Sequence, residues 1–201
     1  MSLDIMIDLE TLGTTADAVI VSIGAVAFNL ETGSTLPEGD ESSQSTFYTV
    51  LDIDTQPRRH ISGDTLAWWM HQGDDARSVF DRVNPAQHHF PARTALGAFE
   101  AWVRTVVLAA NAQRKDIRVW SNGADFDLPM LQHACHTFNV SMPWPPYAGR
   151  CYLTYKNLPG ARAVVMQRTG THHNALDDAI DQARHLCAIY QALFCPKGET
   201  V

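Results

Sequence analysis

The 201-residue chain lacks the features that mark membrane and secreted proteins. Its longest nearly apolar run, residues 18–28, is too short to span a bilayer and is interrupted by Ser22. The first ten residues have neither the basic start nor the apolar stretch of a secretory signal. The four cysteines form no C-x-x-C pair, which argues against a disulfide scaffold or a zinc finger and favours a reduced setting. We therefore expect a cytoplasmic protein with no membrane partner.

Charge is also scarce, at 18% of residues, and its distribution is uneven. The formal net charge of −7 argues against a passive DNA-coating protein. Between Asp127 and Asp177, however, the chain has no acidic residue at all. This acid-free segment carries four cations, Arg150, Lys156, Arg162 and Arg168. Such segregation suits a protein that holds metal ions in one place and phosphates beside them, although chance clustering on a solvated face is the alternative.

The hydrophobic pattern predicts one α/β domain over residues 1–201, because no linker or internal repeat divides the chain. Residues 3–8 alternate between apolar and acidic, which predicts a strand with one face on a core. Further strands are predicted at residues 18–28, 47–53 and 117–120, and the polar stretch 29–46 should connect two of them. Helices are predicted after an N-cap at Asp64 or Thr65, at Asp74–Phe80, and over residues 93–112, 128–138 and 175–194.

Three acidic clusters are candidates for metal ligands. Asp8 and Glu10 share one strand face, and two hard oxygen ligands at that spacing suit Mg²⁺ or Mn²⁺. A solvated strand face would explain the same pair. Asp125 and Asp127 follow a later strand, where either could instead cap a helix. His172-His173-Asn174-Ala175-Leu176-Asp177-Asp178 opens the last helix, where acids are also favoured by the helix dipole.

The order of these clusters resembles the DEDDh branch of the proofreading-type 3′→5′ exonuclease superfamily. The matching stretches are IDLET at residues 7–11, NGADFDLPML at 122–131 and HNALDDA at 173–179. The segment from Trp68 to Gln72 is similar to the W-W-x-x-Q element of the phage exodeoxyribonuclease A and Rv2179c-like exoribonuclease group. Residues 150–154 resemble a later motif of that group, except that Leu153 stands where an Arg is expected.

This resemblance implies a ribonuclease-H-like fold: a mixed five-stranded sheet flanked by helices, with its first three strands antiparallel. The fifth strand should then lie near residues 150–158. It also implies two divalent ions, Mg²⁺ or Mn²⁺, and a His general base that activates water. Carried over by position, the metal ligands are Asp8, Glu10, Asp127 and Asp178, and the general base is His173.

The two doublets leave a second register open, with His172 and Asp177 in these roles. The family pattern H-x-A-L-x-D-A selects His173 and Asp178, whereas the helical stripe of Leu176, Ala179, Ile180 and Ala183 includes neither Asp. Since a His and an Asp five apart on one helix would point about 140° apart, we expect His173 in the loop before the helix.

The implied substrate is the 3′ end of single-stranded DNA or RNA, released as nucleoside 5′-monophosphates. Thr11 and Leu12 should lie against the terminal nucleotide, and Arg150 and Lys156 should guide the phosphate backbone. By the same resemblance, we also expect a homodimer. The alternatives are an enzyme of the same chemistry for very short oligonucleotides, a nucleic-acid-binding module that has lost the reaction, and an interaction protein that binds no Mn²⁺.

Overall fold

The computed structural model describes residues 2–34, 45–84 and 87–195. Within them, a mixed sheet has the strand order β4-β3-β2-β1-β5-β6. The strands are β1 (Leu3–Thr11), β2 (Ile20–Phe28), β3 (Thr46–Leu51), β4 (His89–Phe90), β5 (Ile117–Ser121) and β6 (Gly149–Cys151). The helices are α1 (Gly63–Met70), α2 (Asp74–Arg77), α3 (Ala92–Ala109), α4 (Asp127–Thr137), α5 (Tyr152–Lys156) and α6 (Ala175–Phe194).

The predicted sheet is confirmed except in its number of strands. Strands β1, β2 and β3 pair antiparallel, and β5 and β6 extend the sheet in parallel beside β1. The fifth predicted strand is β6, at the start of the segment where it was expected. A sixth strand was missed: β4 has only two residues and pairs in parallel with the end of β3. Most of the predicted 29–46 connection, residues 35–44, lies outside the described residues.

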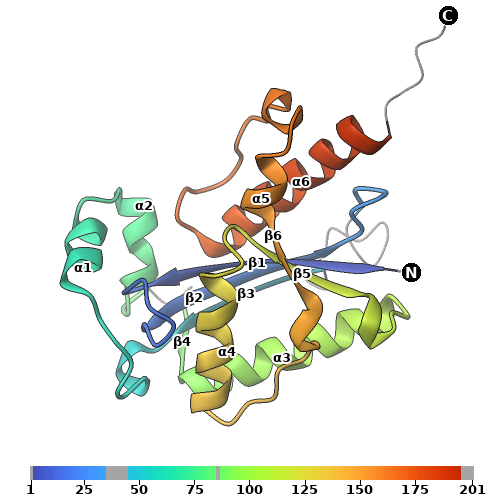
Figure 1. Cartoon of the computed structure of the whole chain (residues 1–201). Helices are drawn as coiled ribbons and strands as arrows, with labels where there is room; N and C mark the ends of the chain where they lie inside the picture. The colour runs from blue at the N-terminus through green and yellow to red at the C-terminus, as the bar shows by residue number, and fades with distance from the viewer. Residues whose placement is uncertain (1, 35–44, 85–86, 196–201) are drawn as a thin grey trace, which may run out of the picture.

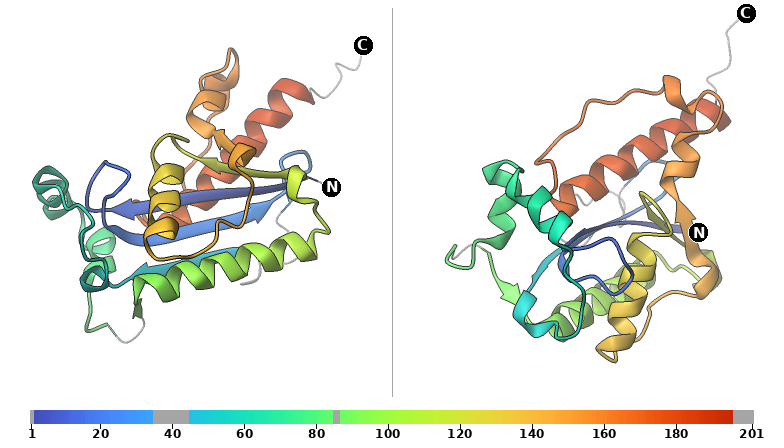
Figure 2. Two further views of the ribbon diagram at one scale, coloured as in Figure 1. Left: turned by 60° about the horizontal axis from the view of Figure 1, so that its bottom comes forward. Right: turned by 60° about the vertical axis from the view of Figure 1, so that its left-hand side comes forward.

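The sheet is covered on both faces (Figures 1 and 2), whereas the sequence predicted a core on only one face of β1. Leu3, Ile5, Ile7 and Leu9 of β1 pack in a core with α3 and α4. The opposite face lies under α6, where Met6 packs with Ala179 and Ala183. The acidic residues of β1 alternate with the first set, so they are directed toward α6 instead of toward solvent.

Helices α1 and α2 form a separate lobe beside the end of the sheet (Figure 1). Its small core joins Trp69 of α1 to Leu12, which follows β1. Helix α1 is capped by Ser62, whose side chain accepts the Thr65 backbone N–H, so the predicted cap at Asp64 or Thr65 was wrong. The Trp69 ring nitrogen also donates to the Thr11 carbonyl at 2.9 Å. These contacts hold α1 against the carboxyl end of β1.

Among the described residues, no helix is long and apolar enough to cross a membrane. All four cysteines are free thiols.

Candidate active site

The carboxyl end of β1 brings two predicted ligands into the protein. Glu10 is 7% exposed, and Asp8 is partly buried two residues before it on the same face. Burial, followed by the charge of Asp127, raises the pKa of Glu10 to about 8. Burial also raises the pKa of Asp8 well above its usual value, with further contributions from Asp127 and Glu10. Carboxylates that are buried close together repel one another, and a bound cation would relieve that repulsion.

Asp127 reaches this pair because β5 runs parallel to β1, so the two carboxyl ends lie at one edge of the sheet. It is the first residue of α4, and its Oδ1 accepts the Leu9 backbone N–H at 3.2 Å. Burial raises the Asp127 pKa to about 7, although this hydrogen bond lowers it. Asp125, the alternative from the same motif, is exposed to solvent. Of the two, Asp127 therefore lies against β1.

Helix α6 brings the fourth carboxylate through an unusually close approach to the sheet. Gly24 of β2 pairs with Asp8, and a Cβ at Gly24 would overlap the backbone of Ala175 and Leu176. The first turn of α6 therefore rests directly on the strand. Asp178, in that turn, is 8% exposed, and Gln182 one turn later donates to Asp8 Oδ1 at 2.8 Å.

His173 lies in the loop before α6, as its spacing from Asp178 predicted, and Asn174 caps the helix. Its φ of 63° is a left-handed conformation, uncommon outside glycine, and it turns the chain sharply before the helix. The His173 ring packs edge-on against Trp68, with ring centroids 4.8 Å apart. Ligand atoms of Glu10, His173 and Asp178 all lie within 4.8 Å of one another.

The other members of the doublets have different contacts. The Asp177 carboxylate accepts the Thr171 backbone N–H at 2.7 Å and so holds the preceding loop. His172 is exposed, and its ring stacks edge-on against His173. Of the two registers, the structure therefore brings His173 and Asp178 together at the site, which are the pair that the family pattern selects.

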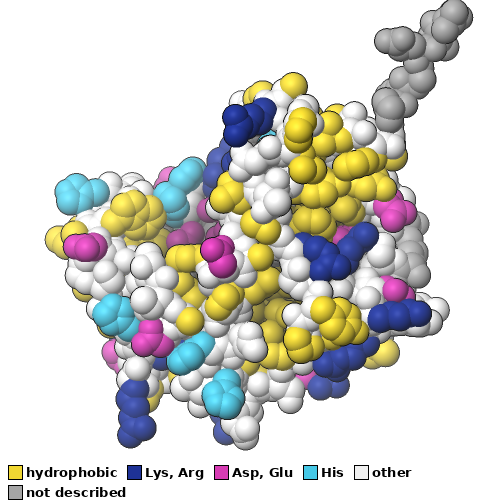
Figure 3. All heavy atoms as spheres, in the orientation of Figure 1, with side chains coloured by type: hydrophobic (Ala, Val, Ile, Leu, Met, Phe, Trp, Pro, Cys, Tyr) yellow, Lys and Arg dark blue, Asp and Glu magenta, His cyan; other side chains and the backbone are white. Residues whose placement is uncertain are grey.

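The donor set fits hard divalent cations. Carboxylate oxygens are the ligands that Mg²⁺ and Mn²⁺ prefer. Four of them come from three distant segments, and burial, the largest cause, raises the pKa of three of them, Asp8, Glu10 and Asp127. Figure 3 shows acidic side chains at the bottom of a hollow, with histidine at its rim. Such a site can hold metal ions and admit a ligand from solvent.

Two side chains in this site were missed from the sequence. Gln182 lies four residues after Asp178, so helical spacing from that ligand could have indicated it. Arg168 forms an ion pair with Asp178, and its charge lowers the pKa of Asp8 and Glu10. Its signal in the sequence was its position in the acid-free segment.

The predicted substrate-binding residues are distributed around the site. Thr11 and Leu12 are buried, so little of either side chain is accessible. Lys156 lines a cavity of about 230 Å³ together with Asp178 and Arg168. Arg150 instead lines a separate cavity of about 430 Å³.

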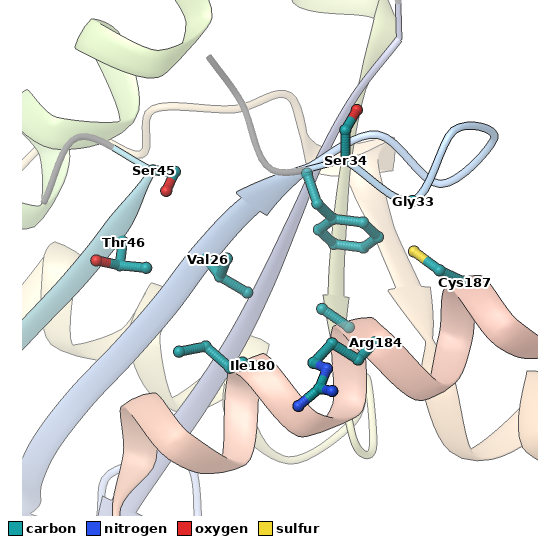
Figure 4. Close-up of a pocket in the computed structure, with 10 residues that line it drawn as sticks. Val26, Gly33, Ser34, Ser45, Thr46, Ile180, Arg184 and Cys187 are labelled. Carbon is teal, nitrogen blue, oxygen red and sulfur yellow. The ribbon is translucent and has the colours of Figure 1, made fainter. Parts of the chain in front are cut away.

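A cavity of about 980 Å³ lies elsewhere, between β2 and the middle of α6 (Figure 4). It is lined mainly by apolar residues such as Val26, Ile180 and Cys187. None of the described residues that line it is acidic, so it lacks the donors that a site for divalent cations needs.

Comparison with solved structures supports the ribonuclease-H-like fold. The nuclease domain of 3′hExo, described as a DEDDh family member bound to rAMP, aligns with a TM-score of 0.60 at 16% identity. The alignment covers 95% of this chain and 92% of that domain. An E. coli ExoI–ssDNA complex aligns with a TM-score of 0.56 at 13% identity, over 97% of this chain and 42% of that one.

Sequence comparisons identify the family. An exodeoxyribonuclease of Enterobacteria phage T4 is 25% identical over 131 residues, which are 64% of this chain. The match spans about half of the phage protein, 53% of its length. A family model described as the 3′-5′ exoribonuclease Rv2179c-like domain matches residues 3–190, nearly the whole chain. The chain therefore belongs to the Rv2179c-like family, whose model is described as a 3′-5′ exoribonuclease domain.

Proposed function

We propose that the chain is a metal-dependent 3′→5′ exonuclease that releases nucleoside 5′-monophosphates from single-stranded nucleic acid. One observation carries the proposal. Asp8, Glu10, Asp127, Asp178 and His173 come from three distant segments and meet at the carboxyl end of β1. A protein that only binds nucleic acid has no use for buried carboxylates that repel one another.

The four carboxylates would hold two divalent ions, Mg²⁺ or Mn²⁺. When bound, such ions lower the pKa of a water molecule and stabilise the charge on the leaving oxygen. The hydrogen bonds of Asp127 with the Leu9 N–H and of Asp8 with Gln182 fix two of the carboxylates in advance. Metal binding then requires little rearrangement of these two side chains.

His173 would take the proton from the attacking water. Burial, then the charges of His172 and Arg168, lowers the His173 pKa, which keeps the ring neutral and able to accept a proton at neutral pH. The water oxygen bonds to the phosphorus of the terminal nucleotide, and the bond from phosphorus to the neighbouring 3′-oxygen breaks. That oxygen gains a proton and becomes the new 3′-hydroxyl, while the terminal nucleotide leaves as its 5′-monophosphate.

The substrate polymer remains DNA or RNA in this proposal. The matching family model is described as an exoribonuclease, whereas the phage relative is described as an exodeoxyribonuclease. Thr11 and Leu12, at the end of β1, would lie near the terminal nucleotide, and Lys156 and Arg150 would contact phosphates. A homodimer stays a prediction, which light scattering after size-exclusion chromatography measures.

Hydrolysis of 5′-labelled DNA and RNA oligonucleotides with Mg²⁺, Mn²⁺ or EDTA tests the function. We expect a ladder that shortens from the 3′ end only when metal is present, with nucleoside 5′-monophosphates as products. A circular oligonucleotide, which has no free end, should stay intact. Binding without cleavage would favour a catalytically silent module. Cleavage restricted to very short chains would favour the oligonucleotide-degrading alternative.

A further inference from the structure

Arg168 is a cation that lies beside the predicted metal ligands. It belongs to the loop between the 3₁₀ turn at Ala161–Ala163 and α6. Its guanidinium forms an ion pair with Asp178, and its charge lowers the pKa of both Asp8 and Glu10. One positive charge thus partly offsets the carboxylates where a divalent ion would bind.

The backbone that follows Arg168 is held by hydrogen bonds, whereas the Arg168 side chain makes ion pairs with Asp178 and, at 3.8 Å, with Asp181. Both the backbone N–H and the hydroxyl of Thr169 donate to Asp181, at 2.8 and 2.7 Å. The Thr171 N–H is held in the same way by Asp177. The Arg168 side chain, in contrast, is 44% exposed. The guanidinium can therefore change its partner by rotation about side-chain bonds while the loop stays in place.

The space open to that rotation is a polar cavity with charged side chains in its wall. Arg168 and Lys156 line the same 230 Å³ cavity, which Asp178 borders. Asn122 and His185 add further polar side chains to its wall. The Asp181 carboxylate lies in the same wall, so the two cations face two carboxylates, Asp178 and Asp181. Once a metal ion takes Asp178, the two cations exceed the remaining carboxylate and match a phosphodiester, of which a guanidinium can bind two oxygens at once.

We propose that Arg168 pairs with Asp178 in the metal-free protein and, once metal binds there, turns to a backbone phosphate of the substrate. This inference rests on the proposed function. The exchange follows from charge: a divalent ion and a guanidinium repel each other at a shared carboxylate. The substrate phosphate then supplies the anionic partner that Arg168 has lost. Arg168 would act as a competitor of the metal and as a ligand of the substrate.

Mn²⁺ binding to the substrate-free protein, measured by calorimetry, tests the first half. Arg168→Gln removes the competing charge with little change in size, so Mn²⁺ should bind roughly two- to five-fold more tightly, the range of a partly exposed ion pair. Arg168→Lys should stay close to the wild type. Arg162→Gln, which removes a charge from the same acid-free segment outside this cavity, should change nothing. Unchanged or weaker Mn²⁺ binding by Arg168→Gln would overturn the competition.

The second half is tested by kinetics on the single-stranded polymer that the wild type cleaves. Arg168→Gln should raise KM about ten-fold and lower kcat less. The slope of log(kcat/KM) against log[salt] should become shallower by roughly 0.7, the value for one phosphate contact on a single strand. Arg168→Lys should restore most of the slope. A purely structural role would lower the melting temperature without opposite changes in metal and substrate affinity.

The outcomes separate this inference from the proposed function. Metal-dependent hydrolysis by the wild type together with an unchanged KM and salt slope in Arg168→Gln would overturn the role of Arg168 alone. Failure of the wild type to hydrolyse any oligonucleotide would overturn the proposed function, while calorimetry would still report on the competition.

Discussion

The face of β1 that lies under α6 carries buried carboxylates at both of its ends, and their surroundings are opposite in kind. At the amino end, Asp4 is fully buried and accepts hydrogen bonds from Arg118 Nε at 2.8 Å and Trp120 Nε1 at 2.7 Å. At the carboxyl end, Asp8 and Glu10 lie beside another carboxylate, and their pKa values are raised. The same strand therefore carries an acid paired with a cation at Asp4 and, four and six residues later, two acids whose charged forms are disfavoured by burial and by a neighbouring carboxylate.

This difference separates structural from functional burial of charge. A buried carboxylate with a cation and hydrogen-bond donors is tolerated by the fold, and removing one partner is strongly destabilising. Buried carboxylates that face one another weaken the fold and persist only where something else selects for them. At the amino end, the partners of the buried carboxylate come from the chain itself, whereas under the proposed function the carboxyl end would take divalent cations from solution.

Substitution of Asp8 should give the largest effect and tests the contrast between the two ends of β1. Asp8→Asn should reduce hydrolysis below detection, because one ligand to the metal ions is lost. The melting temperature in EDTA should stay the same or rise, since a repulsive charge has gone. Oligonucleotide cleavage and thermal unfolding of the same preparation measure both. Near-normal turnover at saturating Mg²⁺ would contradict the assignment of Asp8.

His173→Ala should lower kcat by about 10²–10⁴-fold, the usual contribution of a general base. The wild-type rate should fall as pH drops through the His173 pKa, which burial and neighbouring cations lower from its usual value of 6.5. This acidic limb should disappear in the variant, while calorimetry should show Mn²⁺ binding retained. The matched control is His172→Ala, and a larger effect there would show that the other register operates.

Asp4→Ala should destabilise the protein by about 3–5 kcal/mol, because Arg118 and Trp120 lose the acceptor that satisfies them. The kcat of the protein that remains folded should stay close to the wild-type value. Urea unfolding, together with activity corrected for the folded fraction, measures this. Full stability in Asp4→Ala would abolish the contrast between the two ends of the strand.

Without metal, the carboxyl end should also make stability depend on pH. The Glu10 pKa of about 8 in the folded protein lies above its usual value of 4.5. The folded state therefore binds the proton more tightly, and the free energy of unfolding should fall as pH rises from about 4.5 to 8. Melting temperatures in EDTA measure this decline, which Glu10→Gln should flatten. An equally steep decline in Glu10→Gln would assign it to other groups.

The smallest effects concern the predicted phosphate contacts. Lys156→Ala should raise KM several-fold and flatten the salt slope by one single-strand contact, because it lines the cavity beside Asp178. Arg150 lines a different cavity, which makes Arg150→Ala the natural comparison. Equal effects of the two variants would indicate a substrate path that passes both cavities. No effect of either would leave both cations as solvated surface.

Elements with a clear hydrophobic period could be predicted from the sequence. The strands and long helices lie close to their expected positions, and α6 has the expected bounds. The buried stripe of α6 was less accurate, because Ala175 and Asp178 are buried whereas Leu176 and Ile180 are only partly so. The two alanines of the predicted stripe, Ala179 and Ala183, are buried, whereas its two large residues lie at the edge of the contact with the sheet.

The parts of the fold and of the site that could not be predicted depend on tertiary contacts. β4 is two residues long and exists only as a partner of β3, so no local period indicates it. The burial of both faces of β1 depends on where α6 lies, which the alternation of apolar and acidic residues does not reveal. Arg168 is one of several cations in its segment, and only its contact with Asp178 distinguishes it.

Because Gly24 has no side chain, it sets the distance between the sheet and the first turn of α6, and so the distance across the site. Because β2 and the start of α6 touch through main-chain atoms, the gap between the strand ligands and Asp178 is fixed by the backbone and not by adjustable rotamers. The gap is therefore set when the chain folds, before any ion arrives. A methyl group at this position would push the start of α6 away from β2. The protein would then keep all the predicted ligands in its sequence, but Asp178 would lie too far from the strand ligands to share a metal ion with them.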